Sequence, residues 1–186
     1  IQGESFSQFF TLATKRDLDG LIRKIDGYFK ERIIGETMLP IQILKDKLKS
    51  LENGSNLLPL LDNESDIKIK VGLAHGDMTL SNMIFTDEIY LIDFLDSYIE
   101  SPTMDLVKLR QDTHLHWSLN MVSSVTDLSK IKLGLSYIDD WLVENYPIEK
   151  YELLQIINLQ RIYPYTNDVG IKKYLQTNIN RLCEIL

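Results

Sequence analysis

The sequence has almost no cysteine, no long apolar run and no surplus of basic residues. Its one cysteine, Cys183, cannot form an intrachain disulfide, so we expect a protein of the reducing cytoplasm. No apolar stretch approaches the roughly 18 residues of a membrane-spanning helix. Lysine and arginine together number 20 against 27 acidic residues, which gives a net charge of −7. We therefore expect no membrane insertion, and no nucleic-acid binding, because that function needs a basic surface.

Glycine is also scarce where a phosphate-covering loop would need it. The nine glycines are scattered, and none belongs to a glycine-rich loop. The chain starts at Ile1 and not at methionine, so we expect it to be a piece of a longer protein. With 186 residues and 44% hydrophobic content it can bury a core of its own, so we predict a single domain over residues 1–186.

Apolar periodicity predicts helices on both sides of a short β region. Between residues 18 and 29, apolar side chains recur at i, i+3, i+4, i+7 and i+11, which is typical of an amphipathic helix. Pro40 is expected to open another helix, and residues 53–65 are expected to form a loop. No β-sheet is predicted before residue 66. Ser101 and Pro102 begin a series of further helices, so the predicted fold class is α+β and mainly helical.

The β region is predicted from three short segments. Residues 68–73 alternate in polarity as a strand does, and they lead directly to His75. Residues 83–85 and 89–92 are two more strands, joined by a turn at residues 86–88. A hairpin of this kind brings Asp93, at the end of the return strand, beside Asn82, at the start of the outgoing strand.

Residues 75–82, here called the polar loop, carry the strongest chemical signal. Asp77 and Asn82 have the spacing H-x-D-x-x-x-x-N, and Asp93 follows eleven residues after Asn82. Phosphoryl transfer needs one carboxylate to orient the acceptor hydroxyl and oxygen ligands to hold Mg²⁺ on the phosphates of ATP. Asp77 suits the first role, and Asn82 and Asp93 suit the second. Burying a bare carboxylate in an apolar strand is costly, which also favours a cation beside Asp93.

These segments, together with Ser101-Pro102-Thr103-Met104-Asp105-Leu106, resemble the aminoglycoside and choline phosphotransferase family. The resemblance covers about a third of the chain and implies the C-terminal lobe of the protein-kinase-like fold. It implies Asp77 as the catalytic aspartate, Asn82 and Asp93 as magnesium ligands, His75 as a structural strut and Asp105 as a buried brace of the loop. It also implies ATP and a small hydroxyl compound as substrates: a sugar, an amino sugar or a choline-like alcohol.

The family's N-terminal lobe supplies a nucleotide clamp for which this sequence has no counterpart. We therefore expect a separate N-terminal lobe in the parent protein and weak or no activity of these 186 residues alone. Four further residues are candidates for contacting the acceptor. Asp96 and Glu100 follow Asp93, and His114 and Trp117 follow the helix that contains Asp105. Alternatively, Asp96 and Glu100 are simply solvated, and His114 and Trp117 lie at a partly exposed helix end.

Other interpretations of the motif stay open at the level of the sequence. Asp77 and Asn82 are also typical turn residues, and Asp105 is also a favourable charge in the first turn of a helix. A non-catalytic, pseudokinase-like binding module is the main alternative function. A metal-dependent hydrolase is a second alternative, but it needs a denser set of ligands than the sequence offers.

Overall fold

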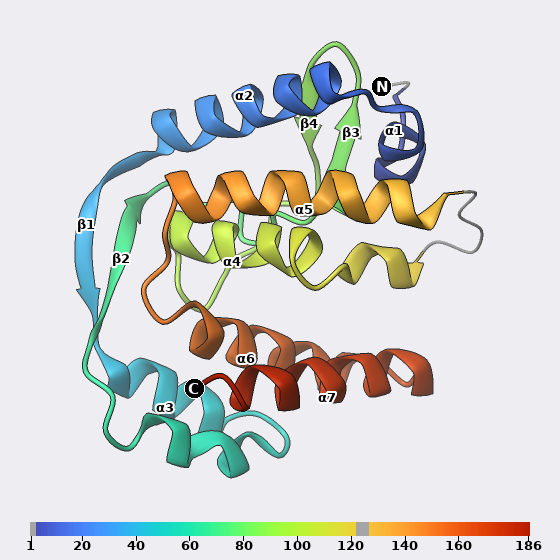
Figure 1. The fold of residues 1–186 in the computed structure, drawn as a ribbon. Coiled ribbons are helices and arrows are strands. Elements are labelled where there is room, and N and C mark those ends of the chain that lie inside the picture. The colour runs from blue at the N-terminus through green and yellow to red at the C-terminus, as the bar shows by residue number, and fades with distance from the viewer. Residues whose placement is uncertain (1–2, 122–126) are drawn as a thin grey trace. The chain divides into compact units, whose positions relative to one another are not determined.

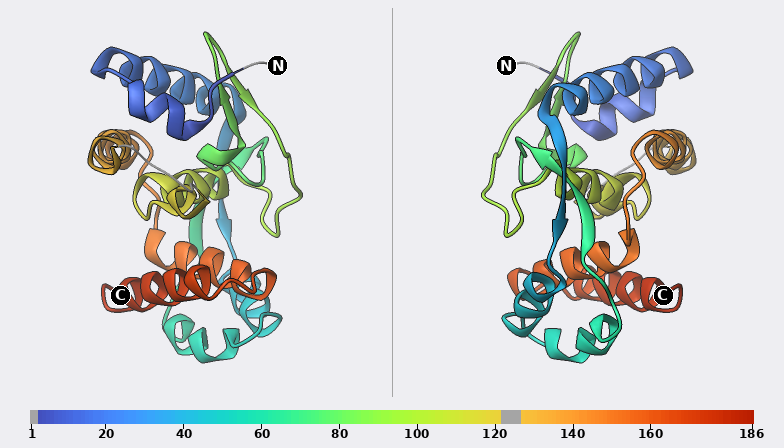
Figure 2. Two further views of the ribbon diagram at one scale, coloured as in Figure 1. Left: turned by 90° about the vertical axis from the view of Figure 1, so that its right-hand side faces the viewer. Right: turned by 90° about the vertical axis from the view of Figure 1, so that its left-hand side faces the viewer.

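The computed structural model describes residues 3–121 and 127–186, and it confirms a mainly helical α+β fold (Figure 1). The chain forms two compact units. Unit 1 contains residues 1–35 and 70–148, and unit 2 contains residues 36–69 and 149–186. Because each unit draws on two separate stretches, the chain leaves unit 1 along β1 (Ile33–Leu39) and returns along β2 (Ile67–Gly72). These two strands pair with each other, and they lie side by side in Figure 2.

Unit 1 surrounds a core of side chains from both parts of its sequence. The first part supplies two helices whose apolar faces are buried in this core; the second supplies the hairpin and the helices that follow it. Ser101 caps the first of these later helices, where its hydroxyl accepts a hydrogen bond from the Thr103 N–H at 3.1 Å. The elements are α1 (Phe6–Leu12), α2 (Lys15–Arg32), η2 (Leu80–Asn82), β3 (Met83–Phe85), β4 (Ile89–Leu91), α4 (Pro102–Thr113), η3 (Trp117–Met121) and α5 (Leu128–Asn145).

Unit 2 is helical apart from its parts of β1 and β2. Helix α6 (Tyr151–Ile162) is buried along most of its length, including the polar side chains of Gln155, Asn158 and Gln160, and α7 (Val169–Cys183) packs beside it. Gln160 on α6 donates a hydrogen bond to the carbonyl of Glu52 at 2.6 Å, and Lys150 forms an ion pair with Glu64. The elements are α3 (Ile41–Lys49), η1 (Gly54–Leu61), α6 (Tyr151–Ile162), η4 (Tyr163–Tyr165) and α7 (Val169–Cys183).

Two expectations about the first 66 residues were wrong. Residues 33–39 form β1, because β2 supplies a partner strand that the local pattern of Ile33–Leu39 does not announce. Residues 54–61 form a 3-10 helix within the stretch expected to be a loop. The expected strands at 83–85 and 89–92 are present, the second of them one residue shorter, with Met83 opposite Leu91 and Phe85 opposite Ile89. Contacts divide the chain into two compact units, and the single domain over residues 1–186 stays a prediction.

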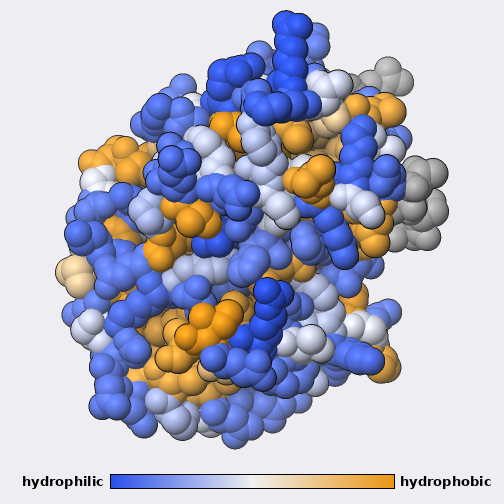
Figure 3. All heavy atoms as spheres, in the orientation of Figure 1, coloured by the Kyte–Doolittle hydropathy of each residue, from blue (hydrophilic) through white to orange (hydrophobic). Residues whose placement is uncertain are grey.

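Hydrophilic side chains cover most of the face drawn in Figure 3. Across the described ranges, no helix combines the length and the apolar character needed to cross a membrane.

The core of unit 1 gives a direct test of packing. Leu135 on α5 is 1% exposed, and Leu133, two residues earlier, is 74% exposed. Leu135→Ala is expected to lower the free energy of unfolding by about 2–5 kcal/mol, because the buried site loses contacts and gains a cavity. Leu133→Ala should change it by less than about 0.5 kcal/mol. Urea unfolding followed by circular dichroism measures both, and equal losses would contradict this packing.

Candidate functional site

The polar loop lies between the end of β2 and the start of β3. Thr79 donates its N–H to the carbonyl of Asp77 at 2.8 Å, and Asn82 donates its N–H to the carbonyl of Thr79 at 3.0 Å, so the loop closes on itself. Gly76 has a φ of +86°, and a Cβ there would lie 1.7 Å from the carbonyl oxygen of Leu95. A glycine is required at this point because the segment after β4 passes directly against the loop.

Asp105, in the first turn of α4, is bonded to the first two residues of the loop. Its carboxylate accepts the N–H of His75 at 2.6 Å and the N–H of Gly76 at 2.8 Å, and Asp105 is 0% exposed. The hydroxyl of Tyr28 on α2 donates to the same carboxylate at 3.3 Å. Burial raises the pKa of Asp105, while the two N–H bonds oppose that rise. The predicted brace therefore occupies the position from which a carboxylate can fix the loop.

The carboxylate of Asp77 is held from two sides. The amide nitrogen of Asn82 lies 3.0 Å from Oδ2 and also donates to the Asp77 carbonyl at 2.9 Å. Lys108 on α4 places its Nζ 2.9 Å from Oδ1. Because Nδ2 of Asn82 makes both of these bonds, its amide oxygen takes no part in them. Lys108 was not among the residues predicted from the sequence, because nothing in its local pattern distinguishes it from a solvated lysine.

Asp112, two turns after Asp105 on α4, is a second buried carboxylate that sequence reasoning missed. It is 1% exposed and accepts the N–H of Leu80 in the loop and the N–H of Ser118 at 2.7 Å. Burial raises its pKa to about 6, and the negative charge of Asp77 adds to this rise. The seven-residue separation from Asp105 is the one signal that could have indicated it, since such residues share a helix face.

Asp93 lies just beyond β4 and not within a strand. Ile92 donates its N–H to the carbonyl of Asn82 at 3.0 Å, and Leu95 donates to the carbonyl of His75 at 3.1 Å, so the backbone on both sides of Asp93 is bonded to the loop. Asp93 itself is exposed and has a φ of +58°. The expectation that its carboxylate is buried in an apolar strand was wrong, because β4 ends at Leu91.

His75 contributes its ring to packing. The ring is buried, with its centroid 4.2 Å from that of Phe94, and Nδ1 accepts the N–H of Asp77 at 3.3 Å. These contacts link the start of the loop to the segment after β4. The role of a structural strut stays a prediction for His75.

The other candidates are divided by the structure. Asp96 and Glu100 are exposed and line a cavity of about 240 Å³ that His75 and Phe94 also line. Trp117 is 7% exposed, and His114 is half-buried at the C-cap of α4. Neither of these two residues lines that cavity. Two of the four predicted contact residues therefore lie beside the polar loop in one cavity, and two do not.

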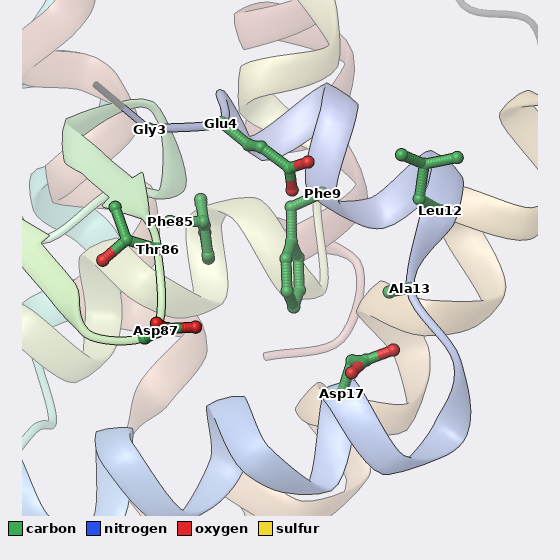
Figure 4. Close-up of a pocket in the computed structure, with 9 residues that line it drawn as sticks. All are labelled: Gly3, Glu4, Phe9, Leu12, Ala13, Asp17, Phe85, Thr86 and Asp87. Carbon is green, nitrogen blue, oxygen red and sulfur yellow. The ribbon is translucent and has the colours of Figure 1, made fainter.

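A larger cavity of about 480 Å³ contains none of the predicted site residues (Figure 4). The carboxyl groups of Glu4, Asp17 and Asp87 surround the ring of Phe9 in this close-up, and that ring stacks on Phe85 with centroids 4.6 Å apart. The three carboxyl groups are exposed to solvent. Size alone therefore does not identify the candidate site, which is defined by the polar loop and α4.

In the described part of the chain, no three histidine, cysteine, aspartate or glutamate side chains form a group that could hold a metal ion. A magnesium ion needs fewer protein ligands than such a group offers. It usually keeps several waters and is bound through one or two carboxylates together with phosphate oxygens. The amide oxygen of Asn82 and the exposed carboxylate of Asp93 are hard oxygen donors, so the chemistry of these two side chains suits the ion.

Asp105 offers a test of how the loop is held. Asp105→Ala leaves the buried N–H groups of His75 and Gly76 without their acceptor, and we expect a loss of about 3 kcal/mol in the free energy of unfolding. Asp140→Ala, at an exposed position of α5, is the matched control and should change it by less than about 0.5 kcal/mol. Urea unfolding measures both, and a value for Asp105→Ala near that of the control would contradict the brace.

Asp112 predicts a particular dependence of stability on pH. Its pKa rises from 3.8 to about 6 on folding, so between these values the folded protein binds a proton that the unfolded chain releases. The free energy of unfolding should therefore fall across this range by about 3 kcal/mol relative to that of Asp112→Asn, which does not titrate. Urea unfolding of both proteins at pH 4, 5, 6 and 7 measures the difference. Asp105 titrates in both proteins and cancels; parallel pH profiles would disprove the prediction.

Comparisons with known proteins leave the family open. No protein-family model and no curated protein matches the sequence. Among solved structures the chain is similar to a glucosamine kinase in complex with glucosamine, ADP and inorganic phosphate, with a TM-score of 0.44 and 13% sequence identity. The match covers 97% of this chain and 51% of the other, so the chain spans about half the length of that kinase. A similarity this distant establishes neither family nor activity.

Proposed function

We propose that this chain is the catalytic-loop part of an ATP-dependent phosphotransferase that acts on a hydroxyl of a small molecule. The observation that carries the proposal is the arrangement around Asp77. Its carboxylate is half-buried, bonded to Asn82 on one oxygen and paired with Lys108 on the other. A carboxylate oxygen has two lone pairs, so each can still accept the proton of an acceptor hydroxyl.

In this proposal Asp77 orients the acceptor hydroxyl and receives its proton as the hydroxyl oxygen attacks the γ-phosphorus of ATP, while the bond from that phosphorus to the β,γ-bridging oxygen breaks and ADP leaves. Little covalent help is needed in phosphoryl transfer, so position and charge carry most of the effect. Asp105 and Asp112 of α4 accept hydrogen bonds from backbone N–H groups of the loop, so the loop has little freedom to shift. A turn that served only to connect β2 with β3 has no need of two buried carboxylates, each of which is costly to desolvate.

Asn82 and Asp93 are the proposed magnesium ligands. When bound, Mg²⁺ neutralises the charge of the phosphate oxygens. The double hydrogen bond from Nδ2 of Asn82 to Asp77 fixes which way its amide oxygen faces. The left-handed backbone of Asp93 also supports the proposal. Strained positions of this kind persist where the surroundings hold them, and they concentrate at functional sites.

The acceptor we propose is a sugar, an amino sugar or a choline-like alcohol, as the resemblance to aminoglycoside and choline phosphotransferases implies. Asp96 and Glu100 are proposed acceptor contacts because both line the cavity beside His75. A separate N-terminal lobe that clamps the nucleotide is part of the same proposal, and we expect weak activity of the 186 residues alone. A non-catalytic binding module would retain the fold but transfer no phosphate.

The experiment is phosphoryl transfer from γ-labelled ATP, with Mg²⁺, to a panel of sugars, amino sugars and choline-like alcohols, using the natural full-length protein. Asp77→Asn is expected to lower kcat by about 1,000-fold, because a group that takes up the proton is lost. Asp87→Asn, in the exposed turn of the hairpin, is the matched control and should keep normal activity.

Normal turnover by Asp77→Asn would refute the role of Asp77. Nucleotide binding without transfer to any acceptor in the panel would favour the binding module instead. Thermal-shift measurements with a non-hydrolysable ATP analogue and Mg²⁺ separate these outcomes, since they report binding whether or not transfer occurs.

A further inference from the structure

One face of α4 contacts the polar loop along most of its length. Asp105, Lys108 and Asp112 stand at i, i+3 and i+7, and residues with this spacing lie on the same side of a helix. Asp105 accepts the N–H groups of residues 75 and 76, Lys108 pairs with Asp77, and Asp112 accepts the N–H of residue 80. The two carboxylates thus hold the backbone of the loop, and the lysine between them holds the side chain of Asp77.

The lysine of this set is unusual in its burial. Lys108 is 9% exposed, although lysine is almost never buried without a partner because its ammonium group is strongly hydrated. Its Nζ lies 2.9 Å from Oδ1 of Asp77, whose own side chain is 25% exposed. A pair this sheltered from water is weakly screened, so it constrains its members more than a surface ion pair does.

A cation at this position also offsets negative charge around the loop. Asp77, Asp105 and Asp112 bring three carboxyl groups to one short segment, and the charge of Asp77 disfavours ionisation of Asp112. Like charges in a partly buried setting repel, and an uncompensated Asp77 would turn toward water. Lys108 lies between the two carboxylates of α4 in sequence and directly on Oδ1 of Asp77.

We propose that Lys108 is the positioning residue of Asp77: its ammonium group fixes one carboxylate oxygen while Asn82 fixes the other, so that the remaining lone pairs face the acceptor hydroxyl. This inference rests on the function proposed above. It assigns Lys108 no contact with substrate. Removing the ammonium group should therefore affect the rate of transfer far more than the binding of the nucleotide.

The test compares Lys108→Met, Lys108→Arg and the matched control Lys132→Met, which removes an exposed lysine of α5. Lys108→Met keeps an apolar stem of similar length and should lower kcat by about 100-fold, because misplacement of a reacting group has effects of that size. Its KM for Mg²⁺–ATP should change less than about 3-fold, because the substitution removes no contact with the nucleotide. Lys108→Arg keeps the charge and should recover most of kcat, and Lys132→Met should behave as the wild type.

A second measurement is independent of activity. Acetylation of lysines by acetic anhydride, followed by mass spectrometry, should modify Lys108 slowly in the wild type and about 10-fold faster in Asp77→Ala, because the variant lacks the carboxylate that holds the ammonium group. An unchanged rate would overturn the pairing even if no acceptor were found.

If the wild type transfers phosphate and Lys108→Met retains its kcat, the positioning role is refuted and the proposed function stands. If no transfer occurs with any acceptor, the proposed function fails, while the labelling result still decides the pairing.

Discussion

The two hydrogen bonds that the first two residues of the polar loop donate to Asp105 are the interaction on which the candidate site depends. Two backbone N–H groups point at one fully buried carboxylate, and neither can turn to water without opening the loop. The carboxylate in turn is tolerated in the core because these donors, and the hydroxyl of Tyr28, satisfy it. The loop and α4 therefore stabilise each other, and these hydrogen bonds set the position of Asp77.

Helix α4 holds the loop at further points because of its helical periodicity. A helix presents residues three, four and seven positions apart on one side, so a loop lying along it can be held at several points by one rigid element. Asp105, Lys108 and Asp112 use three of those positions, and the first two act on adjacent parts of the loop, backbone and side chain. Sites built on a helix are placed more accurately than sites built on loops alone, which suits the phosphoryl transfer proposed above.

Local signals were sufficient for the elements around the site. The alternating residues before His75, the turn at 86–88 and the cap at Ser101 each depend on neighbours in sequence, and each element formed where it was expected. Strand β1 was missed because its burial pattern is nearly all exposed and its stability comes from pairing with β2, some thirty residues away. Propensity measured in a short window contains no information about such a partner.

The same distinction explains the residues of the site. Asp77, Asn82 and Asp93 carry a motif spacing, whereas Lys108 and Asp112 carry none and acquire meaning only from what the fold places opposite them. The exposed position of Asp93 was misjudged for a related reason: the strand ends two residues before it, and the chain then enters a left-handed conformation. An aspartate accepts that conformation more readily than most residues, and hydrogen bonds on both sides hold it there. Because the flanking backbone holds Asp93 at this exposed position, its carboxylate keeps its hydration and needs no buried partner.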